Sequence, residues 1–180
     1  MGERSDATSW RVREAAAPDS DRLALIGAAT FLETFAGLLD GLAIVEHCRK
    51  EHCSAAYRRQ LRAGGKAWLA ETSAGEAPIG FALLGAASLP GTSPDGSDLE
   101  LKRIYTLSRF HGLGLGAALM DAAIAEARRR DARRLLLGVY AGNERAIAFY
   151  RKQGFAPIAN RLFRVGGRDY DDVVFAKPLP

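Results

Sequence analysis

The chain has 180 residues, of which 48% are hydrophobic and 26% charged, and its formal net charge is +4 at pH 7. A chain of this length and apolar content can bury one sizeable core, so we expect one domain over residues 10–180. No apolar run approaches the ~20 residues that span a bilayer, and the N-terminal segment lacks the apolar stretch of a signal peptide. We therefore expect a disordered tail over residues 1–9, a cytoplasmic location and no membrane partner.

The first three elements are predicted from alternation and helical periodicity. Residues 10–15 alternate in polarity, as a half-buried strand does. Pro18-Asp19-Ser20 is a helix-start signal, and the apolar stripe that follows it ends near Ala36. A second helix is expected from about Asp40 to Ala63, before Gly64-Gly65.

The rest of the chain continues the alternation of strands and helices. We expect strands at 66–72, 78–87, 99–106, 134–140, 156–165 and 169–177, a helix from 115 to about 130, and another from 143 to 153. The Pro- and Gly-rich segment 90–97 is expected to be a loop that lines a substrate entrance. The order predicts a mixed α/β fold with about seven strands and about four principal helices.

Two clusters resemble binding sites for partners that we do not expect. Residues 128–130 are three arginines, but positive charge at the end of a helix complements the helix dipole, and no interleaved aromatic residues indicate a nucleic-acid surface. Cys48 and Cys53 lie beside two histidines, but zinc clusters usually bring a second pair of ligands, and the only other histidine is His111. We predict neither nucleic acid nor metal as a partner.

The stretch 99–106, followed at once by His111-Gly-Leu-Gly-Leu-Gly116, is the most informative part of the chain. It predicts a strand that leads through a glycine-rich turn into a helix. Glycines at 112, 114 and 116 remove the Cβ atoms that would block a ligand from the backbone N–H groups. A helix N-terminus behind such a turn favours a phosphate or pyrophosphate, although a lone turn of this kind is weak evidence.

Further phrases come after it in order, namely Arg134 to Tyr140 and then Asn143-Glu-Arg-Ala, Phe149-Tyr150 and Gly154-Phe155. Together with the glycine turn they resemble the GNAT superfamily of acetyl-CoA-dependent N-acetyltransferases over residues 10–178, and most of all the PaiA-like polyamine acetyltransferases. The resemblance implies a mixed, mostly antiparallel GNAT-type sheet and acetyl-CoA as co-substrate.

The resemblance also implies which residues contact the cofactor. The turn residues Gly112, Leu113, Gly114, Leu115, Gly116 and Ala117 would hold the pyrophosphate, and Ile104, Tyr105 and Thr106, on a strand that splays from its neighbour, would pair with the pantetheine arm. One departure is His111, which stands where the family usually has Gln or Arg; an imidazole can still donate to a phosphate. The register that begins at Arg109 fits the motif formally but starts the helix two residues early.

Asn143 and Tyr150 share one face of the last predicted helix. By similarity both belong to the cofactor site, and Tyr150 is the general acid that protonates the departing CoA thiolate. Asn143 also suits the N-cap of that helix, with Gly154 just past its end. The alternative for Tyr150 is a core aromatic residue beside Phe149.

The general base cannot be carried over from the family. Some members have a glutamate on the fifth strand where this chain has Gly138. Glu100 is the substitute that we predict as catalytic, and Glu33 is a candidate for attracting a cationic substrate. Either carboxylate could instead be a solvated surface charge.

These residues predict an enzyme that moves the acetyl group of acetyl-CoA to a primary amine, either a polyamine or another small amine. No Cys or Ser is placed for a covalent intermediate, so direct transfer in a ternary complex is favoured over a ping-pong route. The alternatives are a non-catalytic acyl-CoA sensor and a protein or peptide N-acetyltransferase. A homodimer remains open.

Overall fold

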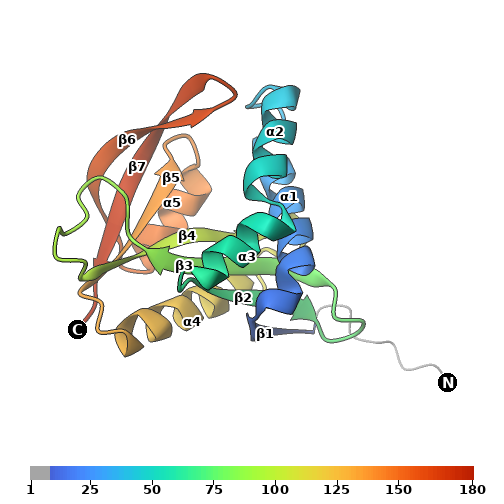
Figure 1. Ribbon diagram of the computed structural model, residues 1–180, viewed down its shortest axis with the longest axis horizontal. Helices are drawn as coiled ribbons and strands as arrows, with labels where there is room; N and C mark the ends of the chain where they lie inside the picture. Colours follow the sequence, from blue (N-terminus) through green and yellow to red (C-terminus); the bar gives the residue numbers. More distant parts are fainter. Residues whose placement is uncertain (1–8) are drawn as a thin grey trace.

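The computed structural model describes residues 9–180, so nearly all of the predicted tail lies outside the described residues. One twisted sheet of seven strands runs through this part of the chain, in the order β1-β2-β3-β4-β5-β7-β6 (Figure 1). Its strands are β1 (Trp10–Ala15), β2 (Lys66–Thr72), β3 (Pro78–Ala86), β4 (Asp98–Thr106), β5 (Arg134–Tyr140), β6 (Ala156–Val165) and β7 (Arg168–Pro178). Neighbouring strands are antiparallel except for β4 and β5. The predicted mixed, mostly antiparallel sheet of about seven strands is confirmed.

Five α-helices occur in the described chain, one more than predicted. They are α1 (Ser20–Phe35), α2 (Gly41–Glu51), α3 (Ser54–Arg62), α4 (Leu115–Arg129) and α5 (Glu144–Lys152), joined by two short 3₁₀ turns, η1 (Ala17–Asp19) and η2 (Ser108–Phe110). Asp40 caps α2, because its carboxylate accepts from the N–H groups of Leu42 and Ala43.

The single helix expected from Asp40 to Ala63 is wrong, because the backbone leaves the helical conformation at His52 and Cys53. The break turns the ring of His52 into the core, where its Nδ1 lies 2.8 Å from the hydroxyl of Tyr57. Periodicity alone did not reveal the break, since both halves keep helical spacing. Tertiary packing of His52 and Tyr57 therefore overrides a pattern that reads as continuous.

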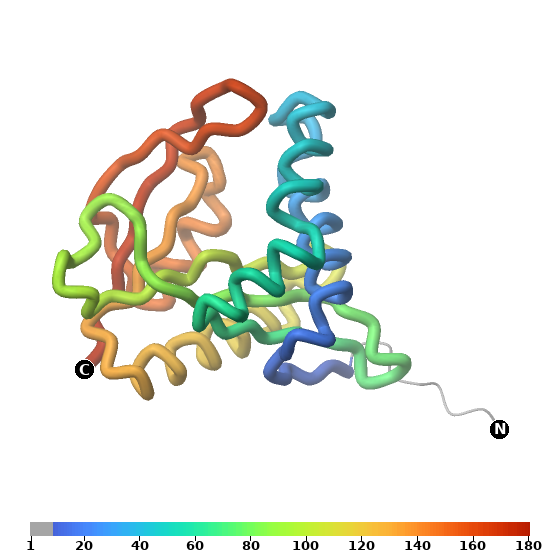
Figure 2. Tube along the Cα trace, in the orientation of Figure 1, coloured from blue at the N-terminus to red at the C-terminus, as the bar shows by residue number. Residues whose placement is uncertain are grey.

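Helices cover both faces of the sheet (Figure 2). On β2, Trp68 and Ala70 belong to a core cluster shared with α4, whereas Ala67 and Leu69 pack on the other face with residues of α1 and α3. We call these two sides of the sheet the α4 face and the α1 face. Helix α4 buries one stripe, which includes Leu115, Leu119 and Ala123, and its exposed positions include Asp121 and Arg128.

The arginines at the end of α4 hold that end to the protein. Arg129 and Arg130 both pair with the buried carboxylate of Glu126, and their hydrogen bonds lower its pKa to about 2. Arg130 also donates to the carbonyl of Gly64. The interpretation of residues 128–130 as the end of a helix is confirmed.

Strands β4 and β5 separate soon after they meet. Their parallel pairing covers only Asp98 to Glu100, opposite Arg134 to Leu136. Beyond it, the edge of β4 that faces β5 has no strand partner in the described chain, and Lys102 is an extra residue that bulges β4 against β3. The sheet is therefore open in its middle, between the two strands that the glycine turn and α5 follow.

The hairpin of β6 and β7 leans across to α2 (Figure 1). A Cβ on Gly166, at its turn, would overlap the Cβ of Ala43 on α2. Val165 packs into a small apolar cluster with Phe31 of α1 and Ile44 of α2. The hairpin and the two helices thus form an arch over the α1 face of the opening.

Candidate functional site

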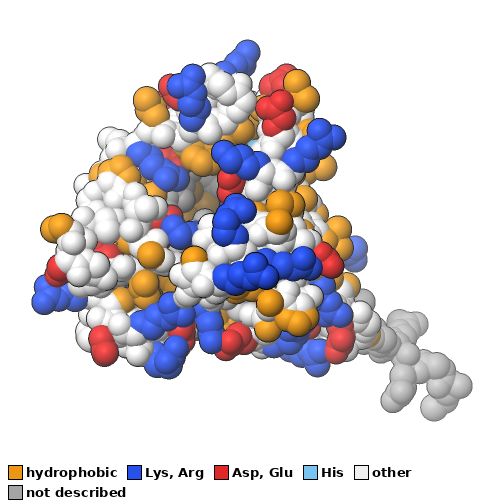
Figure 3. All heavy atoms as spheres, viewed as in Figure 1, with side chains coloured by type: hydrophobic (Ala, Val, Ile, Leu, Met, Phe, Trp, Pro, Cys, Tyr) orange, Lys and Arg blue, Asp and Glu red, His pale blue; other side chains and the backbone are white. Residues whose placement is uncertain are grey.

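A cavity of about 1040 Å³ occupies the opening between β4 and β5. Seen from outside, the surface is hollowed between the β6–β7 hairpin and α2 (Figure 3). Its lining joins Leu101 to Thr106 of β4 with Leu137 to Tyr140 of β5, and it adds residues of both layers of helices. We call the part near the start of α4 and α5 the turn half, and the part beneath the arch the arch half.

The glycine turn presents a row of unpaired amides in the turn half. Gly112 and Gly114 adopt φ values of +82° and +85°, which glycine tolerates best. The first helical hydrogen bond of α4 is donated by Ala118 to Gly114. Among the described residues, the N–H groups from Gly112 to Ala117 have no hydrogen-bond acceptor, so they remain available to an anion.

Gly116 differs from the other two glycines of the turn because its φ is not positive. A Cβ at this position would meet the ring of Phe149 at 3.6 Å, an ordinary contact. The structure therefore distinguishes two reasons for glycine here, since Gly112 and Gly114 shape the turn whereas Gly116 leaves space beside the amides.

His111 lines the cavity but is bonded within the protein. Its Nε2 lies 3.1 Å from the carbonyl oxygen of Thr106, and because a carbonyl only accepts, Nε2 carries the hydrogen. Its Nδ1 is buried and has no partner in the described part of the chain. The ring thus ties the end of β4 to the turn, which sequence reasoning did not foresee.

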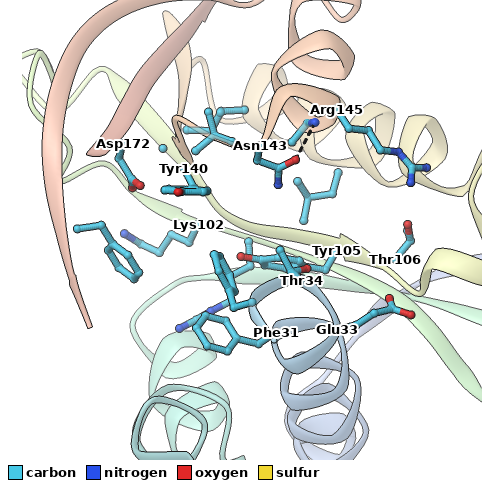
Figure 4. A pocket seen from close by; sticks show the side chains of 18 of the residues that line it. Phe31, Glu33, Thr34, Lys102, Tyr105, Thr106, Tyr140, Asn143, Arg145 and Asp172 are labelled. Carbon is cyan, nitrogen blue, oxygen red and sulfur yellow. Dashed lines mark hydrogen bonds between the residues drawn. The ribbon is translucent and has the colours of Figure 1, made fainter. Parts of the chain in front are cut away.

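Helix α5 and its N-cap bring Tyr150 and Asn143 to the cavity together. Figure 4 shows Asn143 at the wall of the cavity. The side chain of Asn143 accepts from the N–H of Ala146, which confirms the N-cap, and Gly154 follows the helix with φ of +85° as expected. Arg145 and Lys152, which the sequence analysis did not single out, add two positive charges to the same wall.

Tyr150 is 8% exposed, and its ring packs edge-on against Phe149 and Phe155. Burial raises the pKa of its phenol, so the hydroxyl keeps its proton well above neutral pH. No hydrogen-bond partner of this hydroxyl is found in the described chain, although the residue lines the cavity. Tyr150 is therefore both a core aromatic and a cavity residue.

The two predicted carboxylates lie in different places. Glu100 is buried but does not line the cavity, and its Oε2 accepts from the N–H and hydroxyl of Ser88 and from Lys102. The structure thus does not bring Glu100 together with Tyr150. Glu33 does line the cavity, with both oxygens bonded to Ser108.

No residue of the predicted loop over residues 90–97 lines the cavity. Arg134 holds this loop against the sheet by donating to the carbonyl of Gly91, to the hydroxyl of Ser93 and to Asp98.

The arch half contains charged and aromatic side chains that sequence reasoning missed. They include Phe31, His47, Glu51, Arg103, Tyr140, Arg161, Phe163, Tyr170 and Asp172. The ring of His47 stacks on Phe31 with centroids 4.2 Å apart, and Arg103 pairs with Glu51 at 3.2 Å. Such rings attract a cation placed over their faces.

The cluster of Cys48 and Cys53 gives no metal site. No group of three or more possible metal ligands is found over residues 9–180. Both thiols are free, and neither lines the cavity. Burial raises the pKa of Cys48, which makes it a poor nucleophile. No helix within residues 9–180 is long and apolar enough to cross a membrane.

Comparison with known proteins places these features in a family. A family model described as acetyltransferase (GNAT) family matches residues 29–155. An N-acetyltransferase of Mycobacterium tuberculosis, named as uncharacterized, is 32% identical over 161 residues, which cover 89% of this chain and 98% of that protein.

Two solved structures share the fold. The PaiA N-acetyltransferase of Thermoplasma acidophilum in complex with coenzyme A has a TM-score of 0.76 at 19% identity, over 94% of this chain and 99% of that one. The ribosomal-protein-alanine N-acetyltransferase of Brucella melitensis has a TM-score of 0.69 at 27% identity, over the same shares of the two chains.

Proposed function

The chain belongs to the acetyltransferase (GNAT) family and is an N-acetyltransferase that uses acetyl-CoA, and we propose that it moves the acetyl group directly to a small primary amine, such as a polyamine. The observation that carries the proposal is the cavity between β4 and β5. Its turn half offers unpaired amides and its arch half offers carboxylates and aromatic rings, so an anionic and a cationic reactant can meet in one space.

The turn half suits the cofactor. The N–H groups from Gly112 to Ala117 can donate to the pyrophosphate oxygens, and Arg145 and Lys152 supply positive charge beside it. The unpaired edge of β4 at Ile104, Tyr105 and Thr106 can bond to the amides of the pantetheine arm as a further strand would. Acetyl-CoA supplies an activated acetyl thioester at the point where β4 and β5 part.

Direct transfer is favoured by the residues that surround this point. None of the described cysteines lines the cavity, and the hydroxyl of Ser108 is engaged by Glu33. A covalent acetyl-enzyme would need an activated nucleophile beside the thioester. The amine itself is therefore the nucleophile in our proposal, and Tyr150 is the acid that protonates the departing thiolate.

A small acceptor is favoured by the arch. Contact between the Gly166 turn and Ala43 joins the β6–β7 hairpin to α2 above the cavity. A folded protein cannot lay a long segment through a closed arch, whereas a slender amine can enter beneath it. The aromatic walls and the carboxylates of Glu51 and Asp172 are suited to an ammonium group.

The proposal is tested by measuring CoA release and amine acetylation on a panel of acceptors: spermidine, phenylethylamine, Nα-acetyl-lysine and a tetrapeptide that begins with alanine. We expect acetylated spermidine or phenylethylamine as the principal product, and lines that intersect when initial rates are measured at several concentrations of both reactants. Parallel lines would contradict direct transfer.

Two other outcomes would support the alternatives. Efficient acetylation of the tetrapeptide with little reaction of the small amines would favour a protein acetyltransferase. Binding of acetyl-CoA without product from any amine would favour a sensor.

A further inference from the structure

One carboxylate in the arch half is held by only one of its two oxygens. Asp172 on β7 is 5% exposed and lines the cavity. Arg161, opposite it on β6, donates from Nε at 3.1 Å and from Nη2 at 2.9 Å, and both bonds go to Oδ2. Within residues 9–180, the hydrogen bonds that this carboxylate accepts all go to Oδ2, and none goes to Oδ1. The carboxylate is thus fixed in direction while one oxygen stays free.

The position of Arg161 depends on a glycine two strands away. A Cβ on Gly138 of β5 would lie 2.8 Å from Nη2 and 3.1 Å from Cζ of Arg161. Any larger residue at 138 would therefore displace the guanidinium from its place over β5. The three residues lie on neighbouring strands, with Gly138 on β5, Asp172 on β7 and Arg161 on β6. Gly138 leaves space for the guanidinium, and the guanidinium holds the carboxylate.

The carboxylate of Asp172 lies beside Tyr140, its register partner on β5 (Figure 4). The other titratable or charged side chains that line this half are Tyr170 on β7, Arg164 on β6, Lys102, Arg103 and Tyr105 on β4, Glu46, His47, Lys50 and Glu51 on α2, and His52 just after α2. Burial raises the pKa of Asp172, and the bonds from Arg161 partly oppose that rise. Burial raises the pKa of Tyr105, and the charge of Asp172 adds to that rise.

We propose that Asp172 is the catalytic base of this enzyme, and that it binds the acceptor ammonium group through Oδ1 and takes its proton. The inference rests on the proposed function. As the amine nitrogen bonds to the acetyl carbon, the C–S bond of the thioester breaks and its electron pair leaves on the CoA sulfur. Before this step Oδ1 has taken one proton from the ammonium group and released it to solvent, so it can now accept the second N–H proton. The thiolate receives a proton from Tyr150, and Tyr150 regains it from Asp172 through solvent. Arg161 is a positioning residue, because it holds Oδ2 and so aims Oδ1 into the cavity.

The test compares the wild-type enzyme with Asp172→Asn, using spermidine as the acceptor, or phenylethylamine if that is the better substrate. We expect kcat to fall at least about 100-fold, while the affinity for acetyl-CoA changes less than about twofold. The matched control is Asp169→Asn, which removes the same charge from the exposed pair of Asp169 with Arg164 on the same two strands. This control should retain wild-type rates.

The pH profile separates a base from a structural ion pair. The wild-type kcat should fall at acidic pH, because a protonated Asp172 cannot accept a proton. Arg161→Gln removes an interaction that lowers the pKa of Asp172, so it should move this acidic limb to higher pH. In Asp172→Asn the limb should be absent. A kcat within about threefold of wild type in Asp172→Asn, or an unmoved limb in Arg161→Gln, would overturn the proposal.

If Asp172→Asn alone does not fold, the double variant Arg161→Met/Asp172→Asn removes both charges and restores a neutral interior. Its folded protein should bind acetyl-CoA and remain at least about 100-fold slower; wild-type turnover would overturn the proposal. A wild-type enzyme that acetylates no amine contradicts the proposed function itself, whereas an active wild type with an equally active Asp172→Asn contradicts only the role of Asp172.

Discussion

The imidazole Nε2 of His111 donates to the carbonyl oxygen of Thr106, 3.1 Å away, and so closes the segment between the end of β4 and the glycine turn. Two parts of the proposed cofactor site are thereby linked, since Thr106 ends the unpaired edge of β4 and His111 precedes the unpaired amides. The ring holds the strand and the turn in one arrangement before any ligand binds.

His111→Ala should therefore weaken the binding of CoA, because the strand and the turn are no longer held in the arrangement that binds it. Loss of one hydrogen bond of about 1 kcal/mol corresponds to a Kd about fivefold higher. Titration calorimetry with CoA and with acetylpantetheine, which lacks the pyrophosphate, distinguishes the possible roles. Equal losses for both ligands are expected, whereas a loss confined to CoA would mean that His111 contacts phosphate directly.

The turn itself is best tested at Gly116. Gly116→Val should abolish the rise in Tm that acetyl-CoA produces, because the branched side chain covers the amides while the backbone there needs no positive φ. Gly114→Val is less informative, since φ of +85° makes valine strained with or without ligand.

A suitable control for this experiment is Gly41→Val. Gly41 also begins a helix, has open space where a Cβ would stand and does not line the cavity. Its ligand-induced rise in Tm should match that of the wild type. A normal rise in Gly116→Val would show that the pyrophosphate binds elsewhere.

Local patterns in the sequence predicted the turn half of the site but not the arch half. The amides at 112–117 and the cap at Asn143 depend on residues within one turn or helix, so spacing identifies them. Asp172 and Arg161 meet only through the register of two strands. One signal was available in the sequence of β7, because Asp172 falls on the same side of the strand as the buried Val174 and Ala176. A charge in that register indicates a buried partner or a site.

Glu100 was predicted as a base for a reason that is also local. It lies on the strand that feeds the turn, but β4 is still paired with β5 at that residue. The opening begins one residue later, and only the parallel register with β5 reveals where. Spacing along one strand cannot show where a neighbouring strand departs.

The contact between the β6–β7 hairpin and α2 should limit the size of the acceptor. Gly166→Ala adds a Cβ that overlaps Ala43 and should push the hairpin away from α2. We expect KM for spermidine to rise about threefold to tenfold with a smaller change in kcat, and the tetrapeptide to become a better substrate relative to it. Gly167→Ala is a control for backbone strain, because Gly167 also has positive φ but has open space around it. The same change of preference in both variants would mean that backbone strain, and not the contact, is responsible.

The last prediction concerns Tyr150, which is buried and lines the cavity. Tyr150→Phe keeps the ring contacts with Phe149 and Phe155 and removes only the hydroxyl. If the phenol protonates the thiolate, kcat should fall about 100-fold while KM for acetyl-CoA changes little. Because burial raises the pKa of Tyr150, the wild-type enzyme should keep its activity up to at least the ordinary phenol pKa of about 10, where an unperturbed tyrosine would already be half ionised. Loss of activity well below that pH would belong to another group. The test measures kcat of both proteins from pH 7 to 10.5, with Tm recorded at each pH. If the kcat of the Phe variant is undiminished, the thiolate departs without a proton from Tyr150, and Tyr150 is a core residue alone.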